Sequence, residues 1–145
     1  MIAIASDHGG YPLKEHIKAY LAAKGITCQD FGTDSPESCD YPAFGKAAAQ
    51  AVASGQCQWG IVICTTGIGI SMAANKVRGI RCAHCADTVE ARLTREHNDA
   101  NMLAIGAGFT GELLALEMVD VFLNTPFSEG ERHARRVAKV NAIQP

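Results

Sequence analysis

The residues from Trp59 to Lys76 are of types that could bind and activate a small ligand. The apolar, β-branched run from Trp59 to Cys64 is typical of a strand buried on both faces of a parallel sheet. Small residues, hydroxyls and glycines follow at 65–69, and helical spacing begins at Ile68. A strand, glycine loop and helix N-terminus direct several backbone N–H groups at one spot, so the stretch predicts a site for an anion or an oxyanion.

Cys64 has two interpretations. A small buried hydrophobe is the commoner fate of a free cysteine, whereas a reactive thiol is favoured by the neighbouring helix N-terminus and by the sheet edge where ligands bind. Other uses of the loop are excluded by spacing. A dinucleotide fingerprint needs glycine at Met72, and a nucleotide-hydrolase loop needs Gly-Lys before Ser or Thr. A cysteine phosphatase would need an arginine where Ile70 stands.

Two histidines and the Asp7 carboxylate could add acid/base groups, and the Tyr41 segment could join them. His8 follows the first apolar run, His97 lies where a predicted helix has ended, and Tyr41 lies in a turn-rich segment. A carboxylate, an imidazole, a thiol and a row of amides indicate acid/base chemistry and not a metal site. Simpler alternatives remain: His8 as a helix-capping or core residue, and His97 as a solvated side chain or a ligand of helix C-terminal carbonyls.

Arginines near the end of the chain form another candidate. Arg132 and Arg136 are four residues apart, so on a helix they share a face and could hold a phosphate with forked donors. The alternative is an ordinary solvated terminal helix. Cys82 and Cys85 form a C-x-x-C pair, but no second pair exists for zinc and the pair straddles a predicted strand end. We therefore predict that these two cysteines serve packing.

Alternating strands and helices must position these groups, and the hydrophobic pattern predicts both. Strands are predicted at 1–6, 26–31, 59–64, 80–84 and 101–106, and helices at 11–24, 42–54, from 68, and at 88–96, 111–123 and 129–140. The predicted helix caps are Gly25, Asp87, Thr110 and Ser128. This order predicts an α/β fold with a doubly wound, Rossmann-like five-stranded parallel sheet, in which the loops after the strands converge.

Length, charge and cysteine usage set bounds on function. The 145 residues predict a single domain, 1–145, and a net charge of −2 gives no electrostatic case for nucleic acid or an acidic membrane surface. No stretch is long and apolar enough to span a bilayer, and the N-terminus lacks the basic region of a signal peptide. We therefore expect a cytoplasmic protein whose six irregularly spaced cysteines are reduced thiols.

Together and in order along nearly the whole chain, these motifs resemble the ribose-5-phosphate isomerase B family. That family also includes the galactose-6-phosphate isomerase subunits and allose-6-phosphate isomerase. The matching stretches are 7–10, 40–42, 64–71, 74–76, 79–81, 97–101 and 132–136. Several motifs at matching spacing make the resemblance specific at the level of the family.

The resemblance implies an aldose–ketose isomerase that works through a cis-enediolate, with no metal and no other cofactor. Cys64 matches the base that moves a proton between C1 and C2, Thr66 matches the hydroxyl beside it, and His97 matches the acid/base that opens the sugar ring. The implied substrate contacts are Asp7, His8, Tyr41, Asn98, the loop residues Thr65, Gly67, Ile68 and Gly69, and the phosphate ligands Arg132 and Arg136. The family also implies a homodimer or a dimer of dimers with shared active sites, in which the C-terminal helix reaches a partner subunit.

Two residues depart from the family's pattern. Thr65 stands where the family commonly has glycine, and Gly108 stands where ribose-5-phosphate isomerases commonly carry another phosphate-binding arginine. The resemblance makes ribose 5-phosphate the leading substrate, and these two departures favour allose 6-phosphate, galactose 6-phosphate or a tetrose phosphate as alternatives. Two further hypotheses are a sugar-phosphate-binding protein without turnover and a subunit that needs a paralogous partner.

Overall fold

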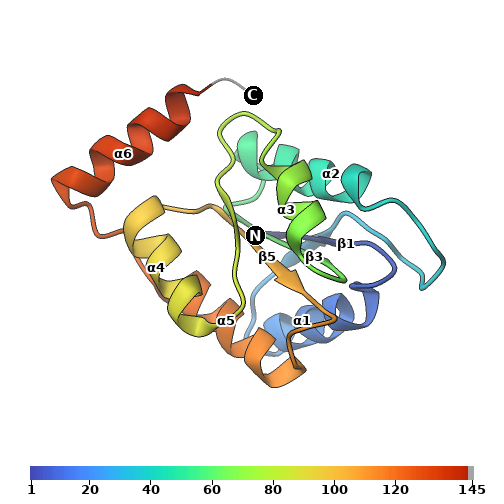
Figure 1. The fold of residues 1–145 in the computed structure, drawn as a ribbon. Coiled ribbons are helices and arrows are strands. Elements are labelled where there is room, and N and C mark those ends of the chain that lie inside the picture. The colour runs from blue at the N-terminus through green and yellow to red at the C-terminus, as the bar shows by residue number, and fades with distance from the viewer. Residues whose placement is uncertain (144–145) are drawn as a thin grey trace.

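The computed structural model describes residues 1–143, which form a five-stranded, fully parallel sheet with helices around it (Figure 1). The strands are β1 (Ile2–Ser6), β2 (Cys28–Asp30), β3 (Trp59–Cys64), β4 (Cys82–His84) and β5 (Met102–Gly106). The helices are α1 (Tyr11–Ala23), α2 (Tyr41–Ala53), α3 (Ile68–Ala74), α4 (Thr88–Asn98), α5 (Glu112–Asn124) and α6 (Glu131–Ala142). The strand order is β2-β1-β3-β5-β4. The chain therefore adds β2 on one side of β1 and then crosses back to add β3 on the other side.

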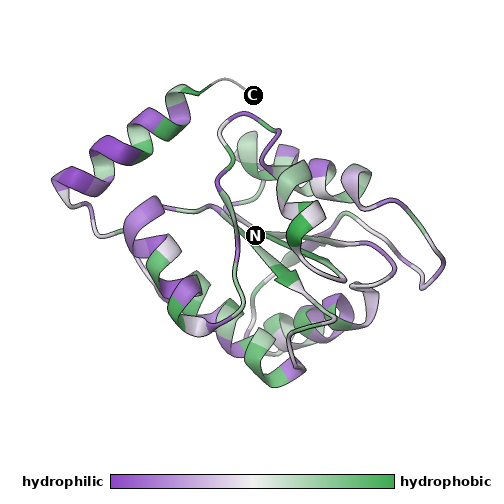
Figure 2. Cartoon of the chain, in the orientation of Figure 1, coloured by the Kyte–Doolittle hydropathy of each residue, from purple (hydrophilic) through white to green (hydrophobic). Residues whose placement is uncertain are grey.

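Helices cover both faces of the sheet, which confirms the predicted doubly wound α/β fold. The three central strands β1, β3 and β5 are buried almost throughout and read as continuous apolar runs, as parallel strands covered on both faces do. On one face Ile17 and Phe122 bring α1 and α5 into an apolar cluster, and on the other Ala48 and Ile70 bring α2 and α3 into a second cluster. Figure 2 shows the apolar central strands between these layers.

The edge strands are shorter than the sequence predicts. β2 covers only Cys28–Asp30 of the predicted 26–31, and β4 covers only Cys82–His84 of the predicted 80–84. These two strands are the edges of the sheet, and each has a hydrogen-bonded neighbour on one side only. The apolar residues beside them therefore pack against the core without joining a ladder, as Ile80 does.

Two of the predicted helix caps are confirmed and two are wrong. Asp87 caps α4 by accepting a hydrogen bond from the amide of Glu90 at 2.8 Å, and Gly25 follows α1 with a φ of 75°. Thr110 is buried, and Gly111 is the cap of α5. The last helix begins at Glu131 and not at residue 129, because the two residues before it have non-helical backbone.

The last helix, α6, is the least embedded element of the fold. None of its residues is buried, and it lies beyond α4 at the margin of the molecule (Figure 1). Its surface is largely hydrophilic (Figure 2), yet Val140 is 53% exposed. Within residues 1–143, no helix has the length and apolar character that crossing a membrane requires.

Candidate active site

Cys64 ends β3 at the carboxyl edge of the sheet, where only 3% of its surface is exposed. Its Sγ accepts a hydrogen bond from the amide of Gly67 at 3.1 Å. Gly67 has a φ of 75°, in the left-handed region that favours glycine. A Cβ there would lie 2.7 Å from the His84 ring and 2.8 Å from the Gly106 nitrogen. The backbone turn that presents this N–H to the sulfur therefore requires glycine.

The loop between β3 and α3 is held by the loops on either side of it. The amides of Ala107 and Gly108 donate to the carbonyls of Cys64 and Thr65, both at 2.9 Å. On the other side, a Cβ on Gly9 would lie 2.2 Å from Oγ1 of Thr65. The Thr65 side chain therefore fills space that a side chain at Gly9 or at Gly108 would need.

A cavity of about 410 Å³ opens beside Cys64 at this edge of the sheet. Its walls come from the loops after β1 and β3 and from the first turns of α2 and α3: Asp7, Tyr41, Cys64, Thr65, Thr66, Ile68 and Gly69. The predicted convergence of three loops is thus confirmed, and the volume is typical of a small-molecule site. No lysine or arginine is among the described residues that line it, so this wall by itself offers no cation to a phosphate.

The loop amides have different surroundings. The Gly67 N–H donates to Sγ of Cys64, and the Ile68 N–H donates to Oγ1 of Thr66 at 3.2 Å. Gly69 is the second residue of α3, where a helix amide has no intrahelical acceptor. A Cβ at Gly69 would lie 2.6 Å from Cζ of Tyr41, so only glycine leaves room for that ring against the start of α3.

Asp7 and His8 follow β1 at the same edge. Oδ1 of Asp7 accepts the amide of Gly10 at 3.1 Å, and this carboxylate lines the cavity although Asp7 is only 6% exposed. Nδ1 of His8 accepts the amide of Cys39 at 3.2 Å. Because an accepting nitrogen carries no proton, the neutral ring holds its proton on Nε2. His8 therefore has a fixed tautomer beside the cavity without being one of its wall residues.

His97 and Asn98 are the last two residues of α4, so the prediction that the helix ends before His97 is wrong. Asp99 caps the helix in the left-handed region, with a φ of 45°, and its Oδ1 accepts a hydrogen bond from Nη1 of Arg95 at 2.8 Å. With this cap the helix runs two residues further than the predicted end at 96. The His97 ring stacks on that of His133 in α6, with ring centroids 4.4 Å apart. Neither His97 nor Asn98 lines the cavity at Cys64.

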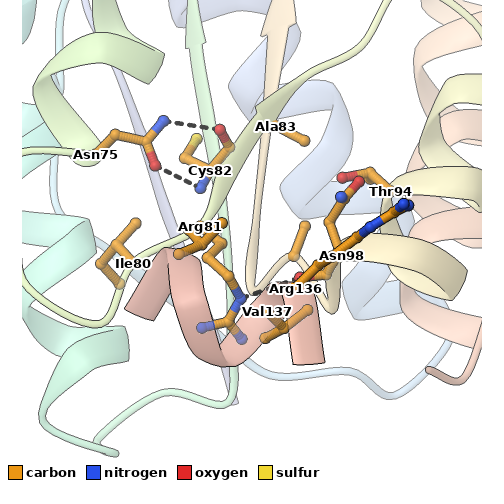
Figure 3. Close-up of a pocket in the computed structure, with 11 residues that line it drawn as sticks. Asn75, Ile80, Arg81, Cys82, Ala83, Thr94, Asn98, Arg136 and Val137 are labelled. Carbon is orange, nitrogen blue, oxygen red and sulfur yellow. Dashed lines mark hydrogen bonds between the residues drawn. The ribbon is translucent and has the colours of Figure 1, made fainter. Parts of the chain in front are cut away.

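Arg132 and Arg136 lie on α6, four residues apart as predicted. A second cavity, of about 250 Å³, lies between α6, α4 and β4, and Asn98 and Arg136 are among its walls (Figure 3). Partial desolvation, and then His97 and the two arginines, lower the pKa of His133. The candidate imidazole, amide and guanidinium groups are thus gathered at the α4–α6 contact, whereas the candidate thiol lines a different cavity.

Cys82 and Cys85 are buried free thiols, as the packing interpretation predicts. Burial raises the pKa of both thiols, to about 12 for Cys85. Groups of three or more His, Cys, Asp or Glu residues that could hold a metal ion do not occur among residues 1–143.

Two charged residues were not predicted from the sequence as site residues, yet both are largely buried. Lys14 is 0% exposed, and its Nζ donates to Asp30 at 2.7 Å and to the carbonyl of Thr33. The Arg81 side chain is 15% exposed and reaches the C-terminal end of α4. Long charged side chains are usually solvated, so no local pattern signals such burial.

A cavity with a thiol, a carboxylate and hydroxyls at the carboxyl edge of a parallel sheet defines an α/β enzyme site for acid/base chemistry on a small polar molecule. The sequence model of the family described as Ribose/Galactose Isomerase matches residues 2–140, and the chain belongs to this family. It is a sugar-phosphate isomerase of the aldose–ketose type.

Individual relatives are similar over almost their whole length. Ribose-5-phosphate isomerase B of Escherichia coli is 46% identical over 143 residues, which cover 99% of this chain and 95% of the relative. Galactose-6-phosphate isomerase subunit LacB of Clostridium acetobutylicum is 44% identical over 143 residues, or 99% and 83% of the two chains. The solved structure of ribose-5-phosphate isomerase B from Clostridium thermocellum superposes with a TM-score of 0.95 at 55% identity, covering 97% of this chain and 94% of the other.

Proposed function

We propose that the protein interconverts ribose 5-phosphate and ribulose 5-phosphate through a cis-enediolate. The observation that carries this proposal is the Cys64 thiol, which lines a small cavity and is oriented by the Gly67 amide. Relatives named ribose-5-phosphate isomerase B, at 46% and 55% identity, support the substrate. A protein that only binds sugar phosphates needs no base at this position.

In the proposed reaction, Cys64 acts as a thiolate that removes the proton from C2 of the open-chain aldose and returns it to C1. A proton on carbon next to a carbonyl is weakly acidic, so the developing enediolate oxygens need hydrogen-bond donors as well as a base. The Thr66 hydroxyl and the backbone at Thr65 and Gly69 border the cavity and are suited to this role. The contacts of Asp7 and Tyr41 with the same cavity suit them to hold the sugar hydroxyls.

His97 is proposed to open the furanose ring, with Asn98 as a substrate contact and Arg132 and Arg136 as phosphate ligands. These groups do not line the cavity at Cys64, and that cavity has no cation of its own among the described residues. We therefore propose a homodimer, which could pair into a dimer of dimers, in which α4 and α6 of one chain complete the site of the other. No metal or other cofactor has a role in this mechanism.

A different phosphorylated sugar is the second candidate, and the surroundings of Thr65 favour it. A Cβ on Gly108 would lie 3.0 Å from the carbonyl oxygen and 3.1 Å from Cγ2 of Thr65, so the two departures from the family pattern are neighbours in space. Compared with the family pattern, a threonine replaces a glycine in the cavity wall, and a glycine replaces an arginine directly behind that threonine. Such a change would alter both its shape and its phosphate contacts, which suits allose 6-phosphate, galactose 6-phosphate or a tetrose phosphate.

An NMR assay of isomerisation distinguishes the candidate substrates. A metal chelator is present throughout, so that turnover cannot depend on a metal ion. Purified protein in D₂O is given ribulose 5-phosphate, and in parallel allulose 6-phosphate, tagatose 6-phosphate and erythrulose 4-phosphate. Deuterium at C2 of the ribose 5-phosphate product is expected. Turnover of only another ketose would keep the chemistry and reject the pentose, binding without exchange would make the protein a sensor, and activity only after a paralogous chain is added would make it a subunit.

A further inference from the structure

Arg81 connects two elements that carry candidate site residues. It lies directly before β4, and its backbone N–H donates to Oδ1 of Asn101 at 2.8 Å. Its guanidinium reaches the end of α4, where Nε donates to the carbonyls of Asn98 at 3.1 Å and Asp99 at 3.0 Å, and Nη2 donates to the latter at 2.7 Å. In the other direction, Nη1 donates to Oδ1 of Asn141 in α6 at 2.8 Å. Figure 3 shows Arg81 at this cavity together with Asn98 and Arg136.

The end of a helix explains why an arginine suits this position. The last carbonyls of a helix have no intrahelical donors and carry the negative end of the helix dipole. A guanidinium answers both needs, because its planar fork donates several hydrogen bonds in fixed directions and carries a positive charge. A lysine would retain the charge, but its single ammonium could not bind the carbonyls of α4 and the Asn141 amide in the same way.

The bond to Asn141 matters because α6 has few other attachments. None of the residues of α6 is buried. Among residues 1–143, the Arg81–Asn141 hydrogen bond is the one that joins α6 itself to the rest of the chain. Two further contacts of this region are the stack of His97 on His133 and, just before the helix, a hydrogen bond from the Ser128 amide to the carbonyl of Glu96 at 3.2 Å. Arg81 therefore holds the C-terminal half of the helix.

We propose that Arg81 is a positioning residue, which holds the α4 end with His97 and Asn98 in register with Arg136 on α6. This inference rests on the proposed function, since it concerns the phosphate-binding and ring-opening groups of that reaction. The hydrogen bonds of the Arg81 side chain go to Asn98, Asp99 and Asn141, which do not line the cavity at Cys64, so we expect the carbon base and its loop to stay intact without it. Its effect belongs to substrate binding and ring opening, and a displacement of about 1 Å costs up to 10²-fold in such a step.

Two variants test this role: one changes the contacts of Arg81 with both α4 and α6, and the other changes the contact with α6 alone. Arg81→Lys loses the fork, and Asn141→Ala loses only the attachment of the exposed α6 residue. We expect KM for the sugar phosphate to rise roughly 10-fold or more in Arg81→Lys and less in Asn141→Ala, with a smaller change in kcat. Amide hydrogen exchange in residues 131–142 should become faster in both variants. Arg92→Gln is the control, because Arg92 is exposed on α4 and its side chain pairs with Glu96.

The outcomes separate the inference from the function on which it rests. A folded Arg81→Lys protein with wild-type KM would overturn the positioning role, whether or not exchange in α6 had changed. An equal loss in Arg92→Gln would also overturn it, because the effect would then come from surface charge. If the wild-type protein turns over no sugar phosphate, the proposed function fails first, and the inference is rejected with it.

Discussion

At the scale of single residues, the Cys64 sulfur is defined by its hydrogen bond. Its thiol is 3% exposed, and the Gly67 amide is 3.1 Å from Sγ. Burial alone would be equally consistent with a core cysteine, as for Cys82 and Cys85. The left-handed turn at Gly67, which aims an N–H at the sulfur beside an open cavity, is what favours a chemical role.

Replacing Cys64 by alanine should remove the base and leave the fold intact. We expect kcat to fall by roughly 10²-fold or more, while the sugar phosphate still binds. The measurement is deuterium incorporation by NMR together with a titration of substrate binding. Cys28→Ala is the matched control, since Cys28 lies half-buried on the edge strand β2 and lines no part of the cavity. Wild-type turnover by Cys64→Ala would reject this thiol as the base.

At the scale of elements, Lys14 joins α1 to the end of β2. Its fully buried ammonium donates to both carboxylate oxygens of Asp30, at 2.7 and 2.8 Å, and to the carbonyl of Thr33. All three protons of the ammonium are thereby used. The segment fixed in this way leads to Cys39, whose amide binds His8, and then to Tyr41 at the cavity.

Asp30→Asn should strongly lower the free energy of unfolding, because the buried Lys14 ammonium loses its hydrogen-bonded carboxylate and keeps only the more distant Glu15 carboxylate, at 3.7 Å, as a counter-charge. The expected loss is about 3–5 kcal/mol, measured by urea unfolding at pH 7. Asp120→Asn is the matched control: its carboxylate pairs with Lys24 at 2.5 Å in a more exposed setting, so a loss of about 0–1 kcal/mol is expected. Equal losses in both variants would show that burial of the Lys14 pair has no special weight.

The same carboxylate predicts a pH dependence. Burial by itself would raise the pKa of Asp30, but hydrogen bonds from Lys14, Lys18 and the Gly32 amide outweigh it and lower the pKa below 3.8. The unfolded chain therefore takes up this proton at a higher pH than the folded protein. The stabilisation is complete above about pH 4 and is lost as the pH falls through the folded value. As the pH is lowered from 6 to 2, the urea midpoint should fall less steeply in Asp30→Asn than in the wild type.

At the scale of the whole molecule, the candidate groups are divided between two cavities. The thiol and a carboxylate line one, and Asn98 and Arg136 line the other, next to the weakly attached α6. A two-fold symmetric dimer would bring one kind of cavity on each chain against the other kind on its partner. Such an arrangement predicts that two damaged chains can form one working site.

Complementation between Cys64→Ala and His97→Ala tests that arrangement. Each variant alone should be nearly inactive, but co-expression with two different tags should produce a mixed dimer in which one site has both groups. In a random 1:1 mixture, about a quarter of the wild-type activity is expected. Active single-tag dimers would show contamination, which purification through both tags controls. A mixed dimer as inactive as its parents would mean that each site lies within one chain.

The sequence by itself determined the elements and the edge at which they meet. Local features are enough for this: β-branched runs form the central strands, Asp87 and Gly25 cap helices through residues close to them in sequence, and parallel strands always end at a common edge. The gathering of Asp7, Tyr41 and Cys64 around one cavity followed from that rule. The ends of helices and edge strands were predicted less accurately, because they depend on side-chain contacts and on strand partners. The end of α4, for example, depends on the hydrogen bond from Arg95 to Asp99.

Only the tertiary structure decided which charges are buried and which groups share a cavity. Lys14 and Arg81 look like solvated residues in the sequence, and their burial depends on partners at Asp30, Thr33 and Asn141 that come near only when the chain folds. The separation of His97 from the cavity at Cys64 was likewise unpredictable from spacing, since it depends on how α4 and α6 pack. A hydrogen bond between distant residues leaves no periodic pattern in the sequence, whereas a strand or a helix does.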